Sequence, residues 1–148
     1  MKPILLVGKP ILERGITYLQ DSGCEIEGVK FWGSPWQPWF FDWAFNLERG
    51  EQLRRKWALI PDDTDVLITH GPPAGILDLC PDGRRVGCGD LRLRVEQIEP
   101  MAHIFGHIHH SAGQVEPLVG RRTRFINAAI CDESYLPTNP VQVIGLPT

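Results

Sequence analysis

The sequence predicts a mixed α/β domain, and three observations support this prediction. Short apolar runs alternate with glycine- and proline-rich turns. A continuous apolar run at 65–71, bounded by turn residues, is typical of a buried strand. Two segments carry apolar residues at helical spacing, one on each side of that run. We therefore expect neighbouring strands joined by helical crossovers within a single domain, 1–148.

The composition is typical of a soluble globular protein. Hydrophobic residues make up 43% and charged residues 22% of the 148 residues, which is enough to form one buried core. The 15 basic and 18 acidic residues leave a net charge of −3, which favours no binding to nucleic acid. No apolar run approaches the ~18 residues of a membrane span, and the first residues lack a secretory-signal pattern. Four cysteines without a Cys-x-x-Cys pair predict reduced thiols and a cytoplasmic location.

The first predicted elements lie before the buried run. The segment 16–35 predicts a short strand followed by two further strands that turn at Glu27–Gly28. The segment 47–60 predicts an amphipathic helix, because apolar residues recur on one face and charged residues lie opposite. The apolar residues of that helix are Leu53, Trp57 and Ile60.

The remaining predicted elements follow the buried run. The segment 88–100 predicts a helix, since its apolar residues recur at i, i+4 and i+7 and it ends before Pro100. Three strand regions complete the prediction: a strand at 102–107, a hairpin at 113–129 turning at Gly120, and a last strand at 141–146.

The histidines gather at two strand ends. Four of the five lie in the stretch HIFGHIHH, 103–110, and the fifth, His70, closes the apolar run before Gly-Pro-Pro. In sheets of this kind the polar site lies beyond the carboxyl ends of the strands. His70 occupies one such end, and His107 and His109 occupy the other. We therefore expect these three side chains to converge, with the last two on one side if their strand continues.

A metal site is the interpretation that the combined histidines favour, because neutral imidazole is the commonest metal-binding side chain. Taken singly, each histidine is more often an ordinary buried or surface residue than a metal ligand. We interpret His103 and His110 in that ordinary way.

The stretch 31–45 is rich in tryptophan and phenylalanine and contains two X-Pro steps that favour an extended loop. Two interpretations remain open for this loop. Its rings either pack the loop onto the core, or form a wall on which a nucleotide base stacks. Trp36 and Trp39 are the candidate substrate-binding residues of the second interpretation. Asn127, a polar residue at the end of an apolar strand, needs hydrogen-bond partners and is a candidate for substrate binding or for orienting the histidine loop.

Four motifs carry a resemblance to a known family. THGPP, HIFGHIHH, FINAA and NPVQVIGLP follow one another in the order found in the carboxyl-terminal part of calcineurin-like metallophosphoesterases. The resemblance is strongest to the branch called metallophosphoesterase domain-containing proteins, which the segment 18–47 also resembles. It spans the chain from about Tyr18 to Pro147.

The resemblance implies part of a β-sandwich flanked by helices, with a two-metal site at the ends of the central strands. His70 and His107 would bind one divalent ion and His109 the other, with manganese, iron or zinc as the metal. A hydroxide activated by the metals would then attack a phosphomonoester or phosphodiester, nucleotides among them.

The amino-terminal metal motifs of that family are absent from this chain. Residues 1–69 contain no histidine, no D-x-H and no G-N-H, and Gly89–Asp90 is the only Gly-Asp pair, which we interpret as part of a helix start. Without a bridging carboxylate we expect weak metal binding. A half sandwich also leaves sheet surface uncovered, which favours a homodimer or pairing with the missing amino-terminal half. The alternatives to a phosphoesterase are therefore an inactive remnant that binds metal, nucleotide or a partner, and a fragment without independent function.

Overall fold

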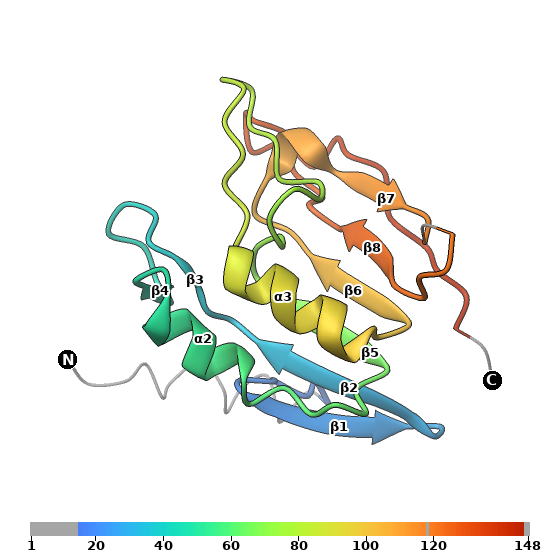
Figure 1. Cartoon of the computed structure of the whole chain (residues 1–148). Helices are drawn as coiled ribbons and strands as arrows, with labels where there is room; N and C mark the ends of the chain where they lie inside the picture. Colours follow the sequence, from blue (N-terminus) through green and yellow to red (C-terminus); the bar gives the residue numbers. More distant parts are fainter. Residues whose placement is uncertain (1–14, 118, 147–148) are drawn as a thin grey trace.

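The computed structural model describes residues 15–117 and 119–146, and its centre is a six-stranded sheet with strand order β1-β2-β5-β6-β8-β7 (Figure 1). A second sheet has two strands, β3 and β4. The strands of the large sheet are β1 (Ser22–Ile26), β2 (Val29–Ser34), β5 (Val66–Thr69), β6 (Ala102–Phe105), β7 (Gly113–Val115) and β8 (Arg124–Asn127). The small sheet pairs β3 (Gln37–Pro38) with β4 (Asn46–Leu47).

The four inner strands of the large sheet are parallel. β2 pairs with β5, β5 with β6 and β6 with β8, all in the same direction. β1 and β7 are antiparallel to their neighbours and form the two edges. The turn at Glu27–Gly28 places both residues at positive φ, 51° and 80°, which matches the predicted hairpin. The α/β prediction is confirmed.

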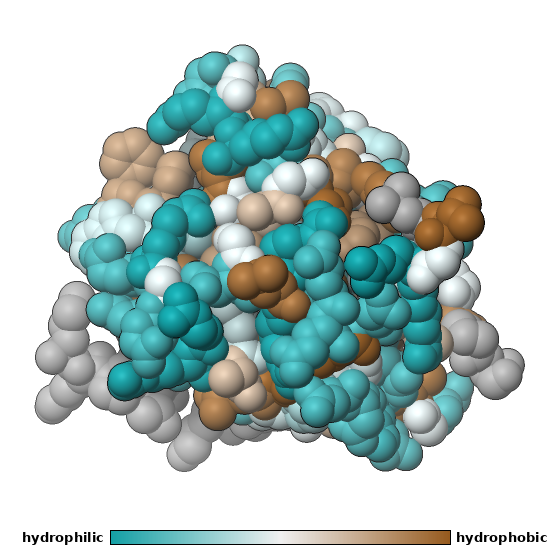
Figure 2. Space-filling model, viewed as in Figure 1, coloured by the Kyte–Doolittle hydropathy of each residue, from teal (hydrophilic) through white to brown (hydrophobic). Residues whose placement is uncertain are grey.

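Two helices, α2 (Glu51–Trp57) and α3 (Gly89–Ile98), lie side by side on the same face of the sheet (Figure 1). Their inner sides and the facing strand residues form the main core. The buried members of this core are Leu53, Trp57, Ile60, Leu67, Cys88, Leu91 and Val95. Seen from this side, the outer surface of the molecule is mostly hydrophilic (Figure 2). This pattern is expected where amphipathic helices turn their apolar side to a sheet.

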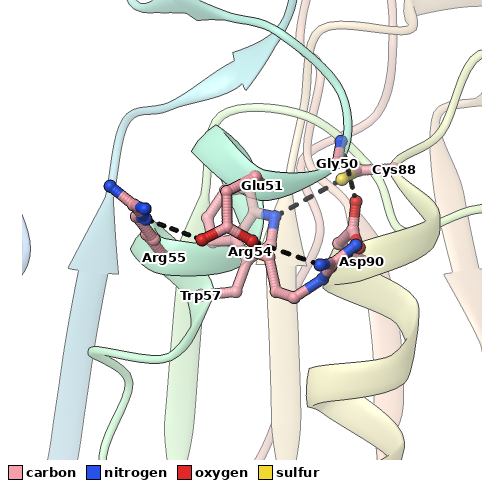
Figure 3. Close-up of polar contacts among 7 residues, drawn as sticks. All are labelled: Gly50, Glu51, Arg54, Arg55, Trp57, Cys88 and Asp90. Atoms are coloured by element: carbon pink, nitrogen blue, oxygen red, sulfur yellow. Dashed lines mark hydrogen bonds and ion pairs between the residues drawn. The ribbon is translucent and has the colours of Figure 1, made fainter.

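Polar contacts join the starts of the two helices (Figure 3). The Asp90 carboxylate accepts hydrogen bonds from the Gly50 backbone N–H and the Arg54 Nε–H, both at 3.2 Å. The Trp57 indole N–H lies 3.4 Å from Cys88 Sγ. Asp90 therefore has a structural role at the start of α3, and it ties this start to α2 rather than capping its own helix.

The opposite face of the sheet has a smaller core. Val66, Ala102 and Ile126 are buried there, and the partly buried Ile144 and Leu146 of the carboxyl-terminal segment pack against them. No helix among the described residues covers this face (Figure 1). No helix in the same part of the chain is long and apolar enough to span a membrane.

Two predicted strands are wrong and one helix is shorter than predicted. The short strand predicted at the start of 16–35 is absent, since residues 16–19 form no strand. Residues 141–146 also form no strand, because Ile144 and Leu146 lie on the sheet face instead of pairing with its edge. The helix predicted at 47–60 begins at Glu51, since Asn46–Leu47 pairs with β3 and Gly50 has a φ of 87°.

Candidate functional site

The two histidine segments meet at the carboxyl ends of β5 and β6, as predicted. β5 ends at Thr69 and β6 ends at Phe105, so His70 and His107 stand just beyond neighbouring parallel strands. The Gly106 backbone N–H donates a 2.9 Å hydrogen bond to the His70 carbonyl oxygen. This bond extends the contact between the strands into the loops that follow.

His70 and His107 are in direct contact. His70 Nε2 lies 3.1 Å from His107 Nδ1, and the ring centroids are 4.8 Å apart. His107 has a φ of 70°, in the left-handed region that is strained for a non-glycine residue. The strand stops at Phe105 and does not continue through His107 and His109. These two side chains are therefore not placed on one side by the alternation of a strand. The turn at His107, just beyond the end of β6, brings its ring against that of His70.

His109 begins the 3₁₀ helix η1 (His109–Ser111) and is held by its own loop contacts. Its Nδ1 lies 2.8 Å from the Asp132 carbonyl oxygen. Because a carbonyl can only accept, Nδ1 carries the proton and Nε2 of the neutral ring keeps a free lone pair. A backbone carbonyl on one ring nitrogen is the usual support of a histidine that binds metal through the other.

The electrostatics of the site favour neutral imidazoles. Loss of water around the His107 ring, together with the charges of His70 and His109, lowers the His107 pKa to about 4. Partial desolvation also lowers the pKa of His70. Near pH 7 both rings are therefore neutral, which is the form that binds a metal ion.

The geometry fits part of a metal site. Two imidazole nitrogens bound to one metal at ~2.0–2.1 Å stand roughly 3 Å apart, and the His70–His107 separation of 3.1 Å agrees with this. Among the residues described, however, no group of three or more histidine, cysteine, aspartate or glutamate side chains is arranged to hold a metal ion. His109 is thus near the pair but not clustered with it. The Asp132 carboxylate, a nearby oxygen donor, accepts bonds from Ser134, Leu136 and Thr138.

A cavity of about 390 Å³ opens beside the histidines. His107 and His109 line one side, and the aromatic loop lines another with Trp39, Phe40 and Trp43. The Phe40 ring stands edge-on to the His107 ring, with centroids 5.0 Å apart. The loop therefore forms a wall of the histidine site.

The substrate-binding candidates divide between this cavity and the interior. Trp39 lines the cavity and is 60% exposed. Trp36 is not among the lining residues, because its indole N–H donates to Asp21 at 2.8 Å and Lys56 Nζ lies 4.4 Å from its ring centroid. Trp36 anchors the loop, as the packing interpretation of the aromatic stretch predicts, whereas Trp39 forms part of the cavity wall.

Asn127 is fully buried at the end of β8 and does not line the cavity. Its Nδ2 donates to the Ile108 carbonyl oxygen at 2.8 Å, and its Oδ1 accepts from the Ala129 N–H at 3.1 Å. Ile108 stands between His107 and His109. Asn127 therefore orients the histidine loop.

His103 and His110 lie apart from this site. His110 is exposed, and His103 is completely buried in β6. Thr69 Oγ1 donates to the Gly71 carbonyl oxygen at 2.8 Å and accepts from His103 Nε2 at 2.9 Å. Burial lowers the pKa of His103 to about 3, so the ring is neutral and its role is structural.

Arg49 and Tyr135 are among the cavity-lining residues that sequence reasoning missed. Tyr135 stands edge-on to His109, with ring centroids 5.5 Å apart. Arg49 lies just before α2 and reaches the site only through the fold. No motif in the sequence marks it.

Comparison with known proteins gives the family relationship. Metallophosphoesterase domain-containing protein 1 of Homo sapiens and that of Mus musculus are each 49% identical over 133 residues, 88% of this chain. A UPF0046 protein of Caenorhabditis elegans is 41% identical over 94% of this chain. The chain spans 40% of the length of the two mammalian proteins and 34% of the nematode one. No family profile matches the chain.

The fold is shared with solved structures, one of which is a crystal structure. It superposes with a TM-score of 0.56 at 21% identity, over 78% of this chain and 47% of the other. The resemblance carried by the sequence motifs is confirmed by the relatives. This chain is a relative of the metallophosphoesterase domain-containing proteins.

Proposed function

We propose that this chain contributes part of a metal-dependent phosphoesterase site that hydrolyses phosphomonoesters or phosphodiesters, nucleotides among them. His70, His107 and His109 would supply imidazole nitrogens to divalent ions of the manganese, iron or zinc type. When bound, such ions neutralise charge on the phosphoryl group and activate water. The relatives are named for a metallophosphoesterase domain, which supports the reaction class.

The observation that carries this proposal is the pairing of His70 with His107. Residues 37 positions apart bring two nitrogens to 3.1 Å at the ends of neighbouring parallel strands. Both rings are neutral near pH 7, and His107 adopts a strained φ of 70° to stand there. Strained backbone that brings together neutral ligand-type groups supports a binding role over a packing role.

The cavity beside the histidines supports a substrate with an aromatic part. Trp39 and Trp43 are 60% and 52% exposed, and both line it. Such rings offer a nucleotide base a stacking surface worth ~1–3 kcal/mol. Trp36 and Asn127 would act on the substrate indirectly, through the loops that they hold.

Hydrolysis of bis-p-nitrophenyl phosphate by the purified chain with added manganese tests the proposal. We expect slow turnover that His107→Ala or His109→Ala reduces at least about tenfold, because each substitution removes a metal ligand. His110→Ala is the matched control, since this histidine is exposed and adjacent to the site. Calorimetric titration of manganese measures metal binding separately in all four proteins.

Absence of both turnover and histidine-dependent manganese binding would contradict the proposal for this chain. Manganese binding without turnover would mean that the three histidines hold a metal but need carboxylate ligands from elsewhere. Turnover equal in His107→Ala and the unsubstituted chain would place any activity outside these histidines.

A second candidate is an inactive module that binds a metal ion, a nucleotide or a partner chain. The observation that favours it is the lack of a complete metal-ligand group among the described residues. The open sheet face supports partner pairing in particular, either with a second copy or with a segment that supplies the remaining metal motifs. Manganese or nucleotide binding without any turnover, or concentration-dependent dimerisation, would support this candidate.

A further inference from the structure

The geometry points to Arg49 as the residue that recognises the phosphate oxygens of the ligand in the histidine cavity, an inference that rests on the proposed function. Arg49 lines the cavity together with His107 and His109. It stands between β4 and α2, far in sequence from either histidine segment. The proposed ligand group is the phosphoryl oxyanion of a phosphoester.

The guanidinium of Arg49 is fixed by backbone groups alone. Nη1 donates to the Gly87 carbonyl oxygen at 2.8 Å, and Nη2 donates to the Val86 carbonyl oxygen at 2.7 Å. None of the ion pairs formed within the described part of the chain includes Arg49. A guanidinium has five N–H donors, so these two bonds leave three for a ligand. The side chain is thus oriented while its charge stays uncompensated.

The segment 86–88, whose carbonyl oxygens accept the hydrogen bonds of Arg49, is bonded directly to the loop after His70. The Cys88 N–H donates to the Pro72 carbonyl oxygen, and the Ala74 N–H donates to the Cys88 carbonyl oxygen, both at 3.0 Å. A Cβ at Gly87 would lie only 2.5 Å from the Pro73 carbonyl oxygen, so the two segments are tightly packed. Arg49 is therefore held at a fixed position relative to His70, which favours recognition of a ligand at both.

The other charges around the cavity differ from Arg49. Arg84 also lines it, but its Nε lies 2.7 Å from the Asp82 carboxylate. Glu133 lines the cavity as well, and it forms no ion pair with Arg49. Arg49 is the cation best placed to bind the planar edge of a phosphate through two donors.

A larger cavity of about 580 Å³ on the helix side offers the contrast. It is lined by three arginines, and each is paired with a carboxylate. The pairs are Arg85–Asp78, Arg92–Glu96 and Arg121–Glu99. An anion entering there would have to displace an existing partner. The smaller cavity requires no such exchange at Arg49.

Calorimetric titration of the metal-free chain with phenyl phosphate tests the inference. We expect Arg49→Gln to weaken binding at least about tenfold, because it removes a charge-assisted hydrogen-bonding group. Arg84→Gln is the matched control and should change the affinity less than about twofold. Phenol, which lacks the phosphate, should bind equally to the unsubstituted chain and to Arg49→Gln.

Equal affinity of Arg49→Gln and the unsubstituted chain, an equal loss in Arg84→Gln, or no phosphate binding at all would overturn the inference. Thermal unfolding reports whether Arg49→Gln remains folded. If it does not, the Nε–H resonance of Arg49 in the unsubstituted chain decides: a saturable shift with phosphate supports the inference, and an unmoved resonance contradicts it.

These outcomes are separate from those of the proposed function. Arg49-dependent phosphate binding in a chain that binds no manganese would retain the anion site and reject the metallophosphoesterase proposal. Hydrolysis that depends on manganese and on the histidines, together with phosphate binding that is unchanged in Arg49→Gln, would retain the metallophosphoesterase proposal and reject the anion site at Arg49.

Discussion

The two faces of the central sheet are built from the same strands but differ in how they are covered. In β5, Leu67 faces the helices and is completely buried, whereas its neighbour Ile68 faces the other side and is 37% exposed. On the helix side, α2 and α3 supply a continuous core. On the open side, the described covering consists of the carboxyl-terminal segment with Ile144 and Leu146, and of Leu19, which packs against Gly33. An apolar run in the sequence predicts a buried strand, and it does not reveal which face lacks a partner.

Truncation of the two neighbouring side chains makes this comparison quantitative and gives the largest expected effect. Leu67→Ala should lower the free energy of unfolding by about 2–5 kcal/mol, because it leaves a cavity in the main core. Ile68→Ala, the matched control, should lower it by about 1 kcal/mol, since the side chain already contacts solvent. Urea-induced unfolding measures both. Equal losses would contradict the difference between the faces and indicate that the open face is covered in solution.

The parts of the fold that the sequence predicted are those with local signals. The turn at Glu27–Gly28 and the helix around Leu91 and Val95 have residue patterns with direct physical causes, and both are present. The last predicted strand failed for a tertiary reason. Ile144 and Leu146 pack flat on the sheet without pairing to an edge, whereas Val141 and Val143 remain exposed.

The candidate site shows the same division between local and tertiary information. Convergence of His70 and His107 followed from strand topology and was predictable. The positive φ at His107 was not, because no pattern marks a left-handed histidine. The hydrogen bond of Trp36 to Asp21 and the approach of Arg49 to Gly87 depend on contacts between distant segments. Such contacts produce no periodic pattern in a single sequence.

Lowering the pH should lower the free energy of unfolding through His103, which lies on the helix-covered face of the sheet. The expected effect is of intermediate size. Burial lowers the pKa of His103 to about 3 in the folded protein, whereas the unfolded chain binds a proton near the ordinary value of 6.5. Between these values the unfolded state holds more protons, so stability falls as the pH decreases from about 6.5. This contribution amounts to about 2 kcal/mol between pH 7 and pH 5.

Replacement of the buried ring isolates that contribution. His103→Leu should flatten the decrease in unfolding free energy over this pH range, and His110→Leu should leave it unchanged because His110 is exposed. Urea unfolding at several pH values measures the slope. An unchanged slope in His103→Leu would show that the folded protein protonates this histidine as readily as the unfolded chain does.

The open face itself gives the smallest expected change in stability but a distinct change in association. Ile68→Lys places a charge beside Ile104, its partner on the neighbouring strand, on a surface that is already partly in water. Because a lysine side chain reaches solvent from there, the free energy of unfolding should fall by only about 1 kcal/mol or less.

If exposed apolar surface drives the chain to pair, the Ile68→Lys substitution should abolish the dimer, since an interface that buries an unpaired charge is strongly disfavoured. Sedimentation velocity over a range of concentrations measures this, with Leu93→Lys as the control because Leu93 is 67% exposed on the helix side. Two outcomes would show that the helix-free face is not a dimer interface. One is a monomer at every concentration, and the other is a dimer that persists in Ile68→Lys but is lost in Leu93→Lys.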